Sequence, residues 1–130
     1  MTAKKAAAAT AAALERAKKH FERASEDPDD ADSVFVWSFY ALENAVVAAA
    51  IHSSAEYQKN HWTKAAAARR LSHSHSLTDV SGLLADLNEA RKGTAYGDVE
   101  EPDIQPADVL EQVGEYLKEV EAFLKQKLGK

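Results

Sequence analysis

Two charged residues stand where the pattern of the sequence otherwise places apolar ones. From Val80 to Ala90, apolar residues recur every three or four positions, which is the spacing of a helix with one buried face. At about 100° per residue, Arg91 falls on the same face as Leu84 and Leu87. An unpaired buried charge costs several kcal/mol, so Arg91 needs a partner, a bound anion or an opening to water. Alternatively, its stem lies along the apolar seam and its head group reaches solvent.

Glu43 is the second such residue, and it interrupts the most apolar segment of the chain. Residues 33–51 are apolar nearly all round; their aromatic and β-branched start would suit a strand, but their unbroken length favours a helix. Such a helix lies at the centre of a bundle or is covered by a second subunit. Glu43 projects among Phe39 and Val46, so pairing with Arg91 is the simplest way to accommodate both charges. A buried pair adds little net stability but marks a specific register or a site.

Four further helices are needed to position these two residues. The pattern predicts an Ala-rich helix over 2–25, a short helix over 60–72, a helix that begins near Thr78 or Asp79, and an amphipathic helix over 106–128. In the short helix, Trp62 and Leu71 are the apolar residues, and Lys64, Arg69 and Arg70 are expected to point outward. The sequence therefore predicts an all-α fold: one domain over 1–130, a bundle of four long helices and one short one.

Composition excludes several classes of protein. The chain has 130 residues, a net charge of −5 and no cysteine, which removes disulfides, thiolate metal sites and cysteine nucleophiles and fits a cytoplasmic location. No apolar run is long enough to span a membrane, and the Ala-rich start is too poor in large apolar residues for a signal peptide. The acidic balance argues against strong non-specific nucleic-acid binding, although the first 23 residues carry six basic and two acidic side chains.

Other candidate chemistry is sparse. His73 and His75 are two apart in a Ser-rich segment expected to be a loop, where they are loop residues or line a polar cleft. Without cysteine or a nearby carboxylate, they do not indicate a metal site. Gly-rich phosphate loops and nucleophile-elbow turns are absent, and the glutamates of the last helix lack the histidines of a di-iron bundle. We therefore expect no metal and no cofactor.

Two segments together resemble the HEPN superfamily of helical domains, and most closely its small bacterial stand-alone members. They are LLADLNEARKGTAYGD, residues 83–98, and SFYALENAVVAAA, residues 38–50; the resemblance covers about residues 31–125. It consists of a long apolar helix with an internal acid, a short helix, a helix with an arginine near its end, and a closing amphipathic helix. It implies an up-and-down bundle that dimerises, with the arginine-bearing helices facing each other across the two-fold axis.

Many HEPN members are metal-independent ribonucleases, whose motif is an arginine, a polar residue, and a histidine four to six positions after the arginine. Arg91 matches the arginine and Lys92 the polar residue, but Tyr96 stands at the fifth position and Asp98 at the seventh. In such enzymes the arginine stabilises the charged phosphorane and the histidine takes the proton of the 2′-OH. Tyrosine, with an ordinary pKa of about 10, is a poor base near neutral pH. His73 or His75 is the alternative source of an imidazole.

Three functions follow from these residues. The first is a non-catalytic homodimeric module that binds a nucleotide, RNA or a partner protein such as a nucleotidyltransferase or an antitoxin, with no membrane partner. The second is a metal-independent ribonuclease of the toxin or defence type, with Arg91, Tyr96 and Glu43 as catalytic residues. The third is a structural bundle in which Arg91 only forms a salt bridge. Residues expected to contribute to binding are Asn88, Lys92, Asp98, His73 and His75.

Overall fold

The computed structural model describes residues 2–96 and 103–126, and the side chains of all of these except 94–96. Its regular elements, within these residues, are five α-helices: α1 Ala3–Glu26, α2 Ala31–Ser53, α3 His61–His75, α4 Ser81–Tyr96 and α5 Pro106–Leu124. The predicted all-α fold is confirmed, and each observed helix overlaps a predicted one.

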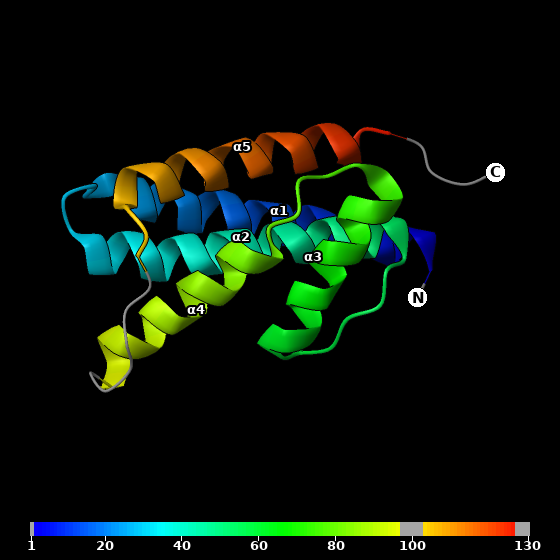
Figure 1. Ribbon diagram of the computed structural model, residues 1–130. Coiled ribbons are helices and arrows are strands. Elements are labelled where there is room, and N and C mark those ends of the chain that lie inside the picture. The colour runs from blue at the N-terminus through cyan, green and yellow to red at the C-terminus, as the bar shows by residue number, and fades with distance from the viewer. Residues whose placement is uncertain (1, 97–102, 127–130) are drawn as a thin grey trace.

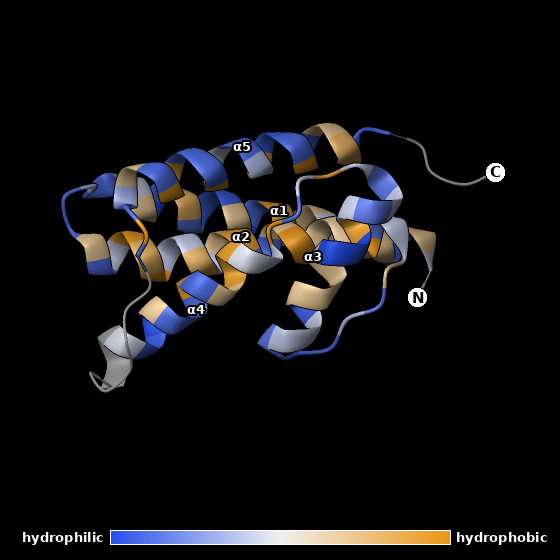
Figure 2. Cartoon of the chain, in the orientation of Figure 1, coloured by the Kyte–Doolittle hydropathy of each residue, from blue (hydrophilic) through white to orange (hydrophobic). Residues whose placement is uncertain are grey.

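Helix α2 is the centre of the fold, because it packs against each of the other four helices. α1, α2 and α5 lie side by side along a common direction, and α3 and α4 are inclined to them (Figure 1). α1 contacts α5, and α3 contacts α4, so that α2 lies between two pairs of helices. The predicted central position of this apolar helix is therefore confirmed. The central and outer helices differ in hydropathy (Figure 2): α2 is mostly hydrophobic, whereas α5 carries a hydrophilic outer face.

The apolar character of α2 would also satisfy a membrane span by length and composition. The most apolar 18-residue window of this helix has a mean hydropathy of 1.6, and 61% of that window is buried inside the bundle. A helix at the centre of a bundle also has no polar face, so it passes the same test of length and composition.

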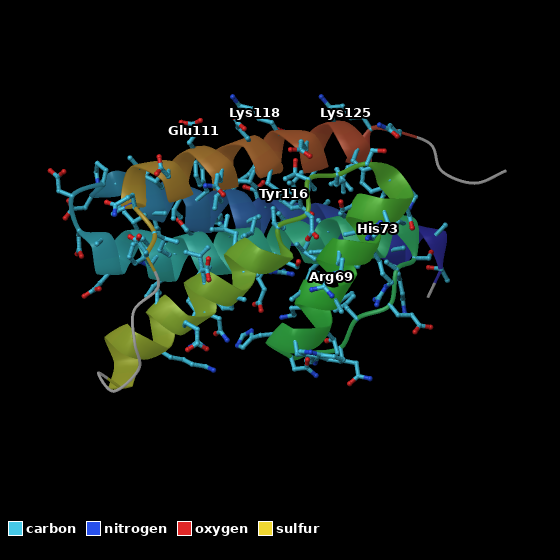
Figure 3. The ribbon with its side chains drawn as sticks, viewed as in Figure 1. Arg69, His73, Glu111, Tyr116, Lys118 and Lys125 are labelled. Carbon is cyan, nitrogen blue, oxygen red and sulfur yellow. The ribbon has the colours of Figure 1, made fainter. Side chains whose placement is uncertain are left out.

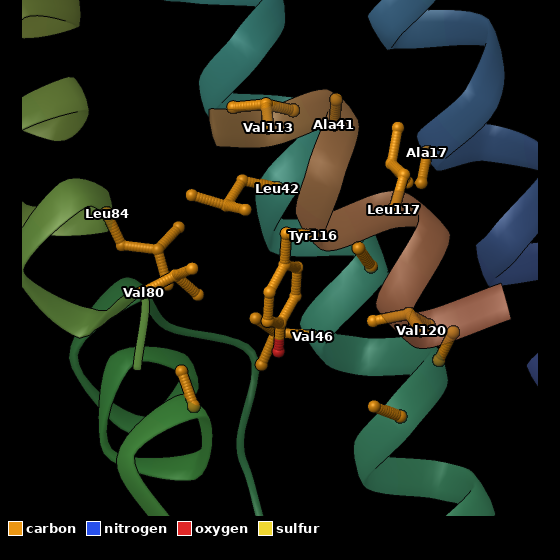
Figure 4. Packing of buried hydrophobic residues seen from close by; sticks show 14 of the residues in the cluster. Ala17, Ala41, Leu42, Val46, Val80, Leu84, Val113, Tyr116, Leu117 and Val120 are labelled. Carbon is orange, nitrogen blue, oxygen red and sulfur yellow. The ribbon is translucent and has the colours of Figure 1, made fainter. Parts of the chain in front are cut away.

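The buried core surrounds α2 and takes residues from all five described helices. Tyr116 of α5 lies beside Leu42 and Val46 of α2, with Val80 and Leu84 on the side of α4 (Figure 4). The apolar period of α5 is confirmed, because its buried residues recur every three or four positions: Val109, Val113, Tyr116, Leu117, Val120 and Phe123. This core fixes α4, and with it the position of Arg91, relative to α2.

The ends of α3 and α5 differ most from the prediction, and α5 ends at Leu124 where residue 128 was predicted. α3 continues to His75 and ends at Ser76, which adopts the left-handed conformation with φ of 61°. His73 and His75 therefore lie on the last helical turn and not in a loop. At α4, Asp79 accepts a hydrogen bond from the Ser81 N–H at 2.9 Å, as expected of a cap. Thr78 instead donates its N–H and hydroxyl to the Glu119 carboxylate of α5, at 2.8 and 2.7 Å, which ties the α3–α4 connection to α5.

Candidate functional site

Glu43 is buried under the first turn of α3. Its side chain is 7% exposed, and its carboxylate contacts Nδ1 of His61 and lies 3.4 Å from Nζ of Lys64. His61 and Lys64 are three residues apart, so they project from the same face of α3 towards α2. The predicted Glu43–Arg91 pair is wrong, because α3 crosses α2 at this level and supplies the charge partners of Glu43.

Arg91 has a different environment. Its Nη2 donates a hydrogen bond to Oδ1 of Asn88 at 2.9 Å, and its Cζ lies 5.3 Å from the centre of the Phe39 ring, a cation–π geometry. Its Nε is buried and has no hydrogen-bond partner within the described residues. Among the side chains that the structure describes, no carboxylate lies within ion-pair distance of Arg91. The positive charge is thus positioned by a ring and a neutral amide.

The Phe39 ring contacts both His61 and Arg91. The ring of His61 packs edge-on against Phe39, with 5.0 Å between ring centres, and Arg91 lies 5.3 Å from the same centre. His61 and Arg91 are therefore no more than about 10 Å apart, although they come from different helices.

A cavity of about 230 Å³ opens beside Phe39, and we call it the α3–α4 pocket. Asn88, the partner of Arg91, lines it, and Glu89 is the carboxylate of its lining. Nζ of Lys92 lies 3.5 Å from Glu89, which offsets that negative charge. The complete lining is Phe39, His61, Trp62, Ala65, Leu84, Ala85, Asn88 and Glu89.

His61 is the group of this site best arranged for proton transfer. A carboxylate can only accept a hydrogen bond, so Nδ1 of His61 carries the hydrogen that faces Glu43. In the neutral ring with this tautomer, Nε2 has a free lone pair, and the His61 side chain is 44% exposed. Together with Lys64 and Arg91, the site can hold an anion and accept a proton.

Comparisons with known proteins give no indication of the function of this chain. No family model, curated protein or solved structure matches the chain. The chemistry of the site therefore has to be argued from its own residues.

The other predicted site residues are distributed unevenly. Asn88 and Lys92 lie near the α3–α4 pocket, as described above. His73 and His75 lie about 18 and 21 Å along α3 from His61, near the opposite end of the helix. Figure 3 labels His73 at this end. The His75 ring packs 5.0 Å from that of Phe123, so neither residue serves as the imidazole of this site. The side chain of Tyr96 and all of Asp98 lie outside the described residues.

Sequence reasoning missed His61 and assigned Lys64 and Trp62 to the wrong faces of α3. Lys64 was expected to point outward, but its side chain is only 19% exposed and is directed at Glu43. Trp62 was expected to be an apolar contact of the bundle, but it is 79% exposed. The spacing of His61 and Lys64 was the available signal, since residues three apart on a helix can both approach one buried carboxylate.

Proposed function

We propose that this chain is a HEPN-like helical module that acts as a homodimer in the cytoplasm and binds the phosphate of a nucleotide or RNA at the α3–α4 pocket. The order of elements supports the HEPN likeness: the long α2 with buried Glu43, the short α3, the arginine-bearing α4 and the amphipathic α5. Partly exposed apolar residues of α2, among them Val36, Tyr40 and Val47, support a dimer interface.

Arg91 is the observation that carries the phosphate proposal. The guanidinium of Arg91 makes one hydrogen bond, from Nη2 to the neutral Asn88, and has no carboxylate at ion-pair distance within the described residues, so its Nη1 donors are left for a ligand. Its planar, permanently charged group suits bidentate contact with phosphate oxygens. Its hydrogen-bond partner Asn88 lines the α3–α4 pocket and restricts the Arg91 side chain, which lowers the entropy that ligand binding would cost.

Metal-independent RNA cleavage is the second candidate, and the contact between Glu43 and His61 favours it. In this reaction Nε2 of His61 removes the proton of a ribose 2′-OH, and the resulting oxygen attacks phosphorus to form a cyclic phosphate. The 5′ oxygen leaves and takes a proton from water. Arg91 and Lys64 stabilise the charge that develops on the phosphate. The role of the missing motif histidine then falls to His61, which reaches the site from α3.

The test of binding compares Arg91→Met with Lys118→Met. Each variant removes one positive charge; Lys118 is exposed and projects from the outer face of α5, away from the pocket (Figure 3). We expect the affinity for a short fluorescent single-stranded RNA to fall about tenfold or more in Arg91→Met, because charge-assisted phosphate contacts are lost. Lys118→Met should change it less than about twofold, apart from weak long-range attraction. Equal losses in both variants would refute a specific phosphate site.

Cleavage is tested on the same RNA in excess chelator, with His61→Asn and Arg91→Met beside the wild type. If His61 is the base, cleavage disappears in His61→Asn while RNA binding persists. Cleavage at equal rates in all three proteins would contradict the catalytic role. Light scattering of each protein gives its mass, and a homodimer has twice the mass of one chain.

A further inference from the structure

A second cavity adjoins the α3–α4 pocket, and Trp62 lines both. This second space has a volume of about 460 Å³, and we call it the Trp62 cavity. It lies between α3 and the segment that joins α2 to α3. Its lining is Ala55, Glu56, Tyr57, Gln58, Trp62, Thr63, Ala66 and Arg70. One exposed indole therefore stands between a cavity flanked by charged groups and a cavity with mixed aromatic and polar walls.

Hydrogen bonds between the connecting segment and α3 hold the walls of the Trp62 cavity. The Gln58 N–H donates to Oγ1 of Thr63 at 2.9 Å, and the Thr63 hydroxyl lies 3.1 Å from the Gln58 carbonyl. Nη2 of Arg70 donates to the Glu56 carbonyl. Because these bonds join residues 56–58 to two different turns of α3, the cavity is built before any ligand enters.

Trp62 is the unusual residue of this surface. It is 79% exposed, and it is the one large hydrophobic side chain of the described residues with such exposure. Exposing an indole loses the free energy that its burial would contribute, and because Trp62 lines both cavities its ring is accessible to a ligand in either. Tyr57 offers a second aromatic ring, while Gln58 and Arg70 offer polar groups that can bond the edge of a flat ligand.

We propose that the Trp62 cavity is a nucleobase subsite, which takes the base of the nucleotide whose phosphate lies in the α3–α4 pocket. This inference rests on the proposed function. A nucleotide joins a flat aromatic base to a phosphate through a sugar. The Trp62 cavity has two aromatic residues in its lining, and the adjoining α3–α4 pocket is lined by His61 and by Asn88, the hydrogen-bond partner of Arg91. Stacking on an indole is tolerant of base identity, because every base has a π-face. The subsite thus selects nucleotides over bare phosphate.

Two probes separate this inference from the proposed function: a short single-stranded RNA of mixed sequence, and inorganic tripolyphosphate, which has no base. Binding of both is measured by calorimetry for wild type, Trp62→Ala, Trp62→Phe and Arg91→Met. We expect Trp62→Ala to weaken RNA binding about tenfold and to leave tripolyphosphate unchanged, since one stacked base is lost. Trp62→Phe should retain most of the RNA affinity, and Arg91→Met should weaken both probes.

The outcomes for the two probes distinguish failure of the nucleobase subsite from failure of the phosphate site. If Trp62→Ala leaves RNA binding unchanged, or weakens both probes equally, the nucleobase subsite is refuted while the phosphate site stands on Arg91→Met. If neither probe binds the wild type, both are refuted. Light scattering adds a further test: if Trp62→Ala converts a dimer into a monomer, a second copy covers Trp62 and the subsite is refuted. In a Trp37→Phe background Trp62 is the remaining tryptophan, and RNA should quench its fluorescence.

Discussion

Replacing Glu43 by methionine separates the stability of the bundle from the chemistry of the site. The two side chains have similar length, but methionine carries no charge. Fully burying an apolar side chain of this size contributes about 1.5–3 kcal/mol, and the Glu43 side chain is 7% exposed. The substitution also removes the hydrogen bond with His61 and the ion pair with Lys64, whose side chains are 44% and 19% exposed. Pairs with partly exposed partners contribute about 0–1 kcal/mol each.

We therefore expect Glu43→Met to leave the free energy of unfolding unchanged or to raise it by about 1 kcal/mol. Both former partners of Glu43 can turn towards water, so neither becomes a stranded charge. Lys64→Met should have the opposite effect and lower the free energy by about 1 kcal/mol or more, because the buried carboxylate loses a partner. RNA cleavage should decrease in Glu43→Met, since His61 loses the group that orients it.

Urea denaturation followed by circular dichroism at the helical band measures both variants. The midpoint and the slope together show whether stability has changed without a change in the surface exposed on unfolding. A loss of more than about 2 kcal/mol in Glu43→Met would refute the reasoning, because it would mean that the pair holds the bundle together. Equal losses in Glu43→Met and Lys64→Met would lead to the same conclusion.

Two further predictions concern groups away from the site. The Tyr116 hydroxyl is buried without a partner in the described structure, and this burial raises the pKa of the phenol. Tyr116→Phe should therefore increase the free energy of unfolding, measured by urea denaturation, by about 1 kcal/mol. A decrease would show that the hydroxyl is hydrogen-bonded. Burial, followed by the charges of Arg23 and Arg16, lowers the pKa of His20 below 6.5. The unfolded state then binds more protons than the folded state, so the wild-type free energy of unfolding should fall as pH drops below about 6.5. In urea titrations of both proteins, His20→Gln should show a smaller fall between pH 8 and pH 5.5. Identical pH profiles would contradict this prediction.

The periodicity of the sequence was sufficient to predict the helices, and the two interruptions of that periodicity led to the site. The apolar spacing of α5 corresponds to its buried residues, such as Val113 and Val120. Glu43 was expected to be buried because it stands among apolar residues, and it is. These features depend on positions close together in the chain, where helical geometry alone determines which residues share a face.

The partners of Glu43 could not be predicted, because they depend on how α3 crosses α2. Trp62 and Lys64 are two residues apart and so face nearly opposite directions on α3. Hydrophobicity alone would turn Trp62 inward. The buried Glu43 carboxylate needs charge compensation, however, and with Lys64 turned inward the indole of Trp62 faces solvent. The residue pattern of α3 alone does not show which of its faces will meet the Glu43 carboxylate of α2, so the orientation of Trp62 and Lys64 could not be predicted from it.

The central position of α2 also determines when the core can close during synthesis of the chain. α1 and α2 are neighbours in sequence and pack together, so a helical hairpin can form early from local contacts. The remaining apolar surface of α2 is covered by elements made later, and that of α5 is not complete until Phe123 has been added. Until then the nascent chain presents the most apolar helix of the protein to its surroundings, which is the state that chaperones bind and that aggregates most readily.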